Sequence, residues 1–268
     1  LLELSDGRRI ETVAMHDGKR RTVCVSSQVG CALGCDFCAT GQLGLKRNLT
    51  TGEIIDQLCH AVDVFRASGH TEYPISNVVM MGMGEPLHNY ESVVRAVRLM
   101  GLEMGLAISV QRVTISTVGL VPQIRRLADE MPRVGLAISL NATTDEVRNR
   151  LMPINARWPI SELMDAAKYM SDRAGRRRVT IEYALIAGIN DTDDDARRLI
   201  CLVSQFPCKI NLIPFNPVPD RPYRRPSVER IRRFHAMLVD RNLTATVRWS
   251  KGDDIAAACG QLQALNVG

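Results

Sequence analysis

Short apolar segments alternate with longer amphipathic segments along most of the chain. The short segments predict buried strands, since runs of about four to eight apolar residues fit a strand. These strands are Arg21–Ser27, Asn77–Met81, Val113–Ser116, Leu136–Leu140, Val179–Ile186, Lys209–Ile213 and Thr244–Trp249. The longer segments repeat their apolar residues on one helical face and predict helices. These helices are Gly52–Ala67, Tyr90–Met100, Pro122–Met131, Ile160–Ala174, Asp193–Gln205 and Ser227–Arg241.

This alternation predicts the fold class. Strands joined by helices, repeated about six times, indicate a parallel sheet with right-handed crossovers. Six units are fewer than the eight of a closed barrel, so we predict an α/β fold with a partial (β/α)6 barrel. We expect a β extension at residues 1–20, with a hairpin over Leu1–Met15 around Asp6-Gly7. The barrel should cover residues 21–249, and a C-terminal segment residues 250–268. Because the chain opens at Leu1 without a methionine, we also expect a further segment upstream.

Polar motifs follow five of the predicted strands at their carboxyl ends. They are Cys31 to Cys38, Gly82-Met83-Gly84-Glu85-Pro86, Ser116-Thr117, Ser139-Leu140-Asn141 and Pro214-Phe215-Asn216-Pro217. In parallel α/β folds the carboxyl ends of the strands form the ligand-binding edge. We therefore expect these motifs to share one site.

Three cysteines, Cys31, Cys35 and Cys38, form a CxxxCxxC motif. Three thiolates on one loop can hold three irons of a [4Fe-4S] cluster and leave the fourth iron open. The alternative is a zinc site with Cys24 as fourth ligand, although zinc sites usually pair two ligands with two more further along the chain. A disulfide within so short a loop is disfavoured, and eight cysteines without a secretory segment indicate a reducing compartment.

Composition and charge narrow the class of protein. Hydrophobic residues make up 46% and charged residues 24%, which excludes a disordered chain. No apolar run approaches the roughly 18 residues needed to span a bilayer, so we expect a cytoplasmic protein without a membrane partner. A net charge of +5 permits a polyanionic partner. Aromatic residues are only 4%, which argues against a stacking platform for single strands and favours one splayed-out base in the barrel mouth.

Together these motifs resemble the RlmN/Cfr family of radical S-adenosylmethionine (SAM) RNA adenine methyltransferases. The resemblance runs from about Glu11 to Leu262. It rests on several separate blocks, among them CVSSQVGC at Cys24–Cys31, GMGEP at Gly82–Pro86, LMPIN at Leu151–Asn155, NLIPFNP at Asn211–Pro217 and GDDIAAACGQL at Gly252–Leu262. The family usually carries a small N-terminal RNA-binding domain, which this sequence does not include.

The resemblance implies a two-step reaction. One SAM methylates Cys259; a second SAM is cleaved reductively to a 5′-deoxyadenosyl radical, which abstracts hydrogen from the methylated cysteine. The carbon radical then adds to the adenine ring. Cys24 resolves the protein–RNA adduct through a transient Cys24–Cys259 disulfide, and Glu11 accepts a proton. The same resemblance places Gly84, Glu85, Ser116, Ser139, Leu140, Asn141 and Asn216 in the SAM pocket, with Glu85 accepting from the SAM ammonium.

Plainer interpretations stand beside several of these roles. Cys24 lies on an apolar strand, where cysteine is often only a small hydrophobe. Glu11 on its own is most simply a solvated charge. The family commonly has histidine where this chain has Asn141, so a role needing a ring nitrogen would be lost there, whereas a backbone contact would survive. The chain's remaining thiols, such as Cys59 and Cys201, are expected to be structural.

The expected substrate is RNA, with adenosine C2 in 23S rRNA as the main target and tRNA as a second one. Pro86 after Gly-Met-Gly-Glu favours this C2 branch over the C8 branch. The resemblance also implies an electron donor such as flavodoxin or ferredoxin, and we expect a monomer. Basic clusters near loops, such as Lys46-Arg47 and Arg221–Arg225, are candidate phosphate contacts. The alternatives are adenine-C8 methylation and a non-catalytic, metal-stabilised RNA-binding protein.

Overall fold

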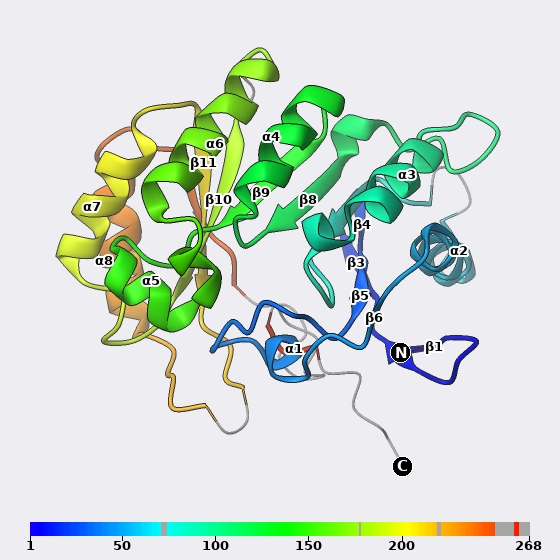
Figure 1. The fold of residues 1–268 in the computed structure, drawn as a ribbon, viewed down its shortest axis with the longest axis horizontal. Helices are drawn as coiled ribbons and strands as arrows, with labels where there is room; N and C mark the ends of the chain where they lie inside the picture. Colours follow the sequence, from blue (N-terminus) through cyan, green and yellow to red (C-terminus); the bar gives the residue numbers. More distant parts are fainter. Residues whose placement is uncertain (71–73, 177, 219–220, 250–259, 263–268) are drawn as a thin grey trace.

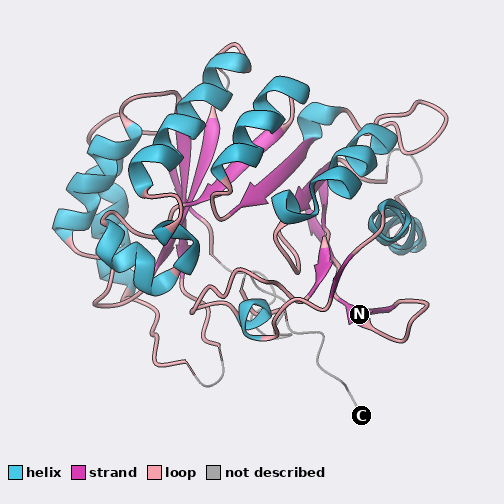
Figure 2. Cartoon of the chain, viewed as in Figure 1, coloured by secondary structure: helices cyan, strands magenta, loops and turns pink. Residues whose placement is uncertain are grey.

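The computed structural model describes residues 1–70, 74–176, 178–218, 221–249 and 260–262. Its centre is a curled eight-stranded sheet in the order β12-β11-β10-β9-β8-β7-β4-β3 (Figure 2). The strands are β3 (Val13–Asp17), β4 (Arg20–Cys24), β7 (Asn77–Met80), β8 (Val113–Thr117), β9 (Gly135–Ser139), β10 (Val179–Leu185), β11 (Cys208–Pro214) and β12 (Ala245–Val247). Every neighbouring pair from β4 to β12 is parallel, whereas β3 pairs antiparallel with β4.

Helices form an arc along the outside of the sheet (Figure 1). They are α2 (Thr51–Ala67), α3 (Tyr90–Met100), α4 (Val121–Glu130), α6 (Ile160–Arg173), α7 (Asp193–Val203) and α8 (Val228–Val239). Each of them connects two consecutive parallel strands, which confirms the predicted partial barrel of six units followed by a last strand. Capping boxes fix the starts of α2, through Thr50 and Glu53, and of α7, through Thr192 and Asp195. No described helix is long and apolar enough to cross a membrane.

Side chains alternate between the two faces of the sheet, as the strand period requires. On β10, Ile181, Tyr183 and Leu185 are fully buried in the apolar core. Between them, Glu182 and Ala184 line a cavity on the other face. The parallel strands therefore carry an apolar row against the helices and a partly polar row toward the barrel interior.

The N-terminal extension consists of two hairpins instead of one. β1 (Leu2–Glu3) pairs with β2 (Arg9–Ile10) around the predicted turn, where Gly7 has a φ of +77° that glycine adopts without strain. The predicted hairpin, however, ends at Ile10. β3 then begins at Val13 and joins the main sheet beside β4, where Val13 pairs with Cys24.

Several short elements near the carboxyl ends of the strands were not predicted. They are β5 (Gln28–Val29), α1 (Ala39–Gln42), β6 (Arg47–Asn48) and α5 (Asp145–Leu151). The helix α5 carries a fully buried arginine, Arg148, and one buried apolar residue, Leu151. A pattern based on apolar periodicity cannot detect a helix of one or two turns whose buried face is built on a charge.

Candidate active site

The three motif cysteines lie on the loop between β5 and α1, at the carboxyl end of β4. Cys35 is buried, Cys31 and Cys38 are partly buried, and all three are free thiols. Burial raises the pKa of the Cys31 thiol to about 12 and also raises the pKa values of Cys35 and Cys38. Buried thiols of this kind become thiolates when a metal supplies positive charge. By donor type, three thiolates on one loop can bind a [4Fe-4S] cluster through three of its irons.

Contacts from distant segments hold the cysteine loop in place. The Asp36 backbone N–H donates to the Leu151 carbonyl at 2.9 Å, and the Asp36 carboxylate accepts from Arg221 at 2.7 Å and from the Tyr223 hydroxyl. Gly41 packs against the same loop, since an added Cβ would lie 2.9 Å from the Cys35 carbonyl oxygen. The loop is therefore fixed by packing and hydrogen bonds on several sides.

The glycine loop after β7 packs directly on the segment that follows β4. Gly82 donates to the Val25 carbonyl at 3.1 Å, and a Cβ at Gly82 would lie 2.7 Å from that oxygen. Gly84 has a φ of +97°, and its Cβ would lie 2.5 Å from the Gln28 side chain. Both positions therefore require glycine, because the backbones approach too closely for a side chain.

Glu85 connects this loop to the end of β8. Its side chain is buried, Oε1 accepts from the Leu87 N–H at 3.1 Å, and Oε2 accepts from the Val118 N–H at 2.9 Å. Burial raises the pKa of Glu85 to about 7, although these hydrogen bonds oppose the rise. The carboxylate thus has a structural role that the sequence did not reveal. A carboxylate has about four acceptor sites, and the bonds from Leu87, Val118 and the Thr117 side chain leave one of them for a ligand.

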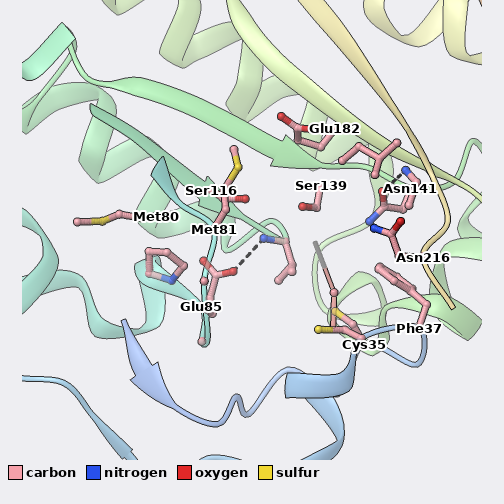
Figure 3. Close-up of a pocket in the computed structure, with 18 of the residues that line it drawn as sticks. Cys35, Phe37, Met80, Met81, Glu85, Ser116, Ser139, Asn141, Glu182 and Asn216 are labelled. Carbon is pink, nitrogen blue, oxygen red and sulfur yellow. Dashed lines mark hydrogen bonds between the residues drawn. The ribbon is translucent and has the colours of Figure 1, made fainter. Parts of the chain in front are cut away.

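A cavity lies at the carboxyl ends of the strands and brings most of the predicted residues together (Figure 3). It is lined by Cys35, Cys38, Gly84, Glu85, Ser116, Ser139, Asn141 and Asn216, among others. Leu140 differs from these residues because its side chain is fully buried in the apolar core and is not part of the lining. The ends of five strands, together with residues of β10, therefore contribute to one cavity.

The backbone conformation and the hydrogen bonds at position 141 explain why asparagine is accepted there. Its φ of +57° lies in the left-handed region, which asparagine tolerates better than most residues. Its Oδ1 accepts from the Ala184 N–H at 2.8 Å, and its carbonyl accepts from Asn190 at 2.8 Å. The side chain thus ties the end of β9 to β10.

The structure describes two of the three predicted catalytic residues, Cys24 and Glu11. Cys24 is buried at the carboxyl end of β4. Glu11 is partly buried two residues before β3, and its carbonyl accepts from Ser26 at 2.6 Å, so both residues lie near the same end of the sheet. Cys259 lies outside the described residues. The structure shows no disulfide among the described cysteines, so the predicted Cys24–Cys259 bond is not supported.

Residues 260–262 are hydrogen-bonded to the start of α1, directly after Cys38, and to Pro217. The Ala39 N–H donates to the Gly260 carbonyl at 2.8 Å, and Thr40 Oγ1 donates to the Leu262 carbonyl at 2.5 Å. Gln261 Nε2 donates to the Pro217 carbonyl at 2.9 Å. Gly260, the neighbour of Cys259 in the sequence, therefore lies beside Ala39. Gly260 also lines the cavity.

Several basic residues expected to face RNA are already paired within the protein. Arg47 bonds Glu53 at 2.7 Å, and Arg221 bonds Asp36 at 2.7 Å. Pairing neutralises part of their charge. Exposed basic residues without a described ion pair, such as Lys46 and Arg224, are better placed for phosphate contacts.

Arg148 is a functional residue that the sequence analysis missed. Its buried guanidinium donates to the carbonyls of Val118, Ser139 and Leu140 at 2.6, 3.2 and 3.0 Å, and to Asn155 Oδ1 at 2.8 Å. Burial lowers its pKa to about 10, so it is cationic at neutral pH. One side chain thus joins the ends of β8 and β9 beside the cavity.

Replacing Arg148 by methionine should lower the free energy of unfolding by about 3 kcal/mol, because several buried carbonyls lose their donor. For a chain of this size, that corresponds to a fall in melting temperature of roughly 6–12 °C. Thermal unfolding of the purified protein measures it. Arg150→Met, at an exposed position of the same helix, is the matched control and should change little. Equal melting temperatures for the two variants would contradict this role.

The curled parallel sheet and the three-cysteine loop at its ligand edge define a radical SAM protein. The family model for the Radical SAM superfamily matches residues 25–200. A crystal structure of a radical SAM methyltransferase from Sphaerobacter thermophilus superposes with a TM-score of 0.95 at 52% sequence identity, covering 98% of this chain and 76% of that one.

Curated relatives narrow the family further. The dual-specificity RNA methyltransferase RlmN of Marinobacter nauticus is 50% identical over 263 residues, which are 98% of this chain and 71% of that protein. RlmN of Syntrophotalea carbinolica is 51% identical over 264 residues, or 98% and 68% of the two chains. The chain therefore belongs to the RlmN family of the radical SAM superfamily.

Proposed function

We propose that this chain methylates C2 of an adenosine in 23S rRNA, and of the adenosine 3′ of the anticodon in some tRNAs. The observation that carries the proposal is the shared cavity. It joins two motif cysteines, the polar ends of four further strands and Gly260, the neighbour of Cys259. Membership of the RlmN family and Pro86 after the glycine loop support C2 over C8.

The cysteine loop would hold the [4Fe-4S] cluster through Cys31, Cys35 and Cys38. When bound, the cluster supplies the electron that cleaves SAM to a carbon radical. Two SAM molecules would be used per turnover, one as methyl donor and one as radical source, and a flavodoxin or ferredoxin would deliver the electron. The protein would act as a monomer.

The chain's own residues would orient SAM and handle the transferred carbon. Glu85, Ser116, Ser139 and Asn216 would bind SAM from four strand ends, with Gly84 and the backbone around Asn141 beside them. Cys259 would accept the methyl group and carry it to the adenine. Glu11 would take the proton released from the ring, and Cys24 would free the product from Cys259.

Glu85→Gln should weaken SAM binding while leaving iron content unchanged. The substitution removes one ionic hydrogen bond to the SAM ammonium, worth about 1.5–3 kcal/mol. That corresponds to a roughly 10- to 150-fold loss of affinity. Glutamine retains one oxygen acceptor, which limits the damage to the Leu87 and Val118 contacts. Calorimetry with SAM under anaerobic, non-reducing conditions measures the effect, and unchanged affinity would exclude Glu85 as the ammonium acceptor.

The proposed function is tested by product stoichiometry. The reconstituted protein is incubated anaerobically with rRNA or tRNA fragments, SAM and a low-potential reductant. Equal amounts of S-adenosylhomocysteine and 5′-deoxyadenosine per methylated RNA are expected, because the two SAM molecules have different fates. S-adenosylhomocysteine without 5′-deoxyadenosine would indicate polar methyl transfer, and RNA binding without either product would indicate a non-catalytic protein.

A further inference from the structure

β10 contributes a buried carboxylate to the cavity for which no role has been assigned. Glu182 is 4% exposed and lines the same cavity as Ser139, with which it is in register on the neighbouring strand. Figure 3 shows Glu182 on the cavity wall, on the far side of Ser139 from Cys35. The carboxylate therefore lies in the interior of the barrel, away from the cysteine loop.

One oxygen of Glu182 is anchored by the protein. Asn211 on β11 donates through Nδ2 to Oε1 at 2.9 Å, and Thr246 on β12 donates to Asn211 Oδ1 at 2.8 Å. The register explains this row, since Glu182 pairs with Asn211 and Asn211 pairs with Thr246. The side chain is thus held in one orientation by two neighbouring strands.

The other oxygen has no partner among the residues that the structure describes. Oε2 of Glu182 is buried and accepts no hydrogen bond from any described residue. Burial raises the pKa of Glu182, while the Asn211 bond and the charges of Arg248 and Lys209 oppose the rise. A buried acceptor without a donor is costly, so native proteins rarely retain one unless it serves a ligand or a reaction.

The chemistry of the expected ligands limits the donor to an adenosine group. The SAM ammonium is assigned to Glu85, which lies near the cysteine loop. The remaining donors are the ribose hydroxyls and the exocyclic amino group of an adenosine. Both SAM and the target nucleotide carry an adenosine, so these two sources share the same chemistry.

We propose that Glu182 is a binding residue that accepts a hydrogen bond through Oε2 from the adenosine bound in the cavity. Asn211 and Thr246 position the carboxylate for this contact. The inference rests on the proposed function in two respects, namely that an adenosine ligand occupies the cavity and that Glu85 binds the SAM ammonium. An acceptor at this position would also select against a nucleoside that presents only acceptor atoms there.

The test uses the reconstituted full chain and the variants Glu182→Gln and Glu182→Ala. Glutamine can keep its oxygen toward Asn211 and place its amide N–H₂ where Oε2 was, so a ligand donor would meet a donor. Glu103→Gln, at an exposed position, is the charge-matched control. SAM affinity is measured by anaerobic calorimetry without reductant. RNA affinity is measured by gel shift, with S-adenosylhomocysteine present.

At least a tenfold loss of affinity is expected for Glu182→Gln in one of these two measurements, with an unchanged or higher melting temperature for the ligand-free protein. Loss of SAM affinity identifies the SAM adenosine as the donor, and a loss restricted to RNA identifies the target adenosine. A merely structural carboxylate would lower the melting temperature without this selective loss. If Glu182→Gln binds SAM as tightly as the wild type does, and also binds RNA as tightly, the inference is overturned. If the wild type binds neither ligand, the proposed function itself fails.

Discussion

Cys259→Ala is expected to abolish RNA methylation completely and to form no covalent protein–RNA species. The proposed reaction begins with methyl transfer to the Cys259 thiolate, so alanine removes the carbon carrier before RNA is involved. The hydrogen bonds of Gly260 and Leu262 to the start of α1, directly after Cys38, support placing this carrier near the cavity. Denaturing gel electrophoresis after incubation with RNA, SAM and reductant measures the adduct.

Cys24→Ala should give the opposite result on the same gel. Cys24 would act only after the carbon bridge between Cys259 and RNA has formed, so its loss should accumulate the crosslinked species. Cys201→Ala, an exposed cysteine on α7, is the matched control and should behave as wild type. A crosslink in Cys259→Ala, or full turnover without a crosslink in Cys24→Ala, would refute the assigned roles.

The second large effect concerns the cluster. Cys35→Ala should lose nearly all bound iron and all SAM cleavage, because a cluster held by only three thiolates has no spare protein ligand. The wild type should bind about four irons per chain after anaerobic reconstitution, with the brown colour of an iron–sulfur protein.

Cys24→Ala again serves as the comparison. Iron content and colour should be unchanged in this variant, because Cys24 lies on β4 and is proposed to act on the RNA adduct. Loss of the cluster in Cys24→Ala, or a colourless wild-type protein that binds zinc, would favour the four-cysteine zinc alternative.

The fold could be predicted because strands and helices carry strong, regular patterns. The six long helices and their parallel strands were predicted to within a few residues, since each buries one apolar face. Short elements that are held in place by buried polar side chains were not predicted. The short helix α5 is anchored by Arg148, whose role depends in part on the carbonyl of Val118, 30 residues away in the sequence.

The candidate site was predictable where a motif marks it and unpredictable where only geometry does. The cysteines and the glycine loop have characteristic spacings, and the structure brings Cys35, Cys38 and Glu85 to one cavity. Glu182 sits in an apolar strand with no motif, and its unpaired oxygen is visible only once Asn211 is placed beside it. The two backbone bonds of Glu85 were hidden for the same reason.

The central claim is radical methylation of adenosine at C2. The most direct measurement is mass spectrometry of nucleosides digested from rRNA and tRNA after reaction with SAM carrying a deuterated methyl group. We predict 2-methyladenosine carrying the label, absent when Cys259 or Cys35 is replaced by alanine. Labelled 8-methyladenosine would assign the chain to the other branch of this chemistry, and RNA without any labelled methyladenosine would contradict the account.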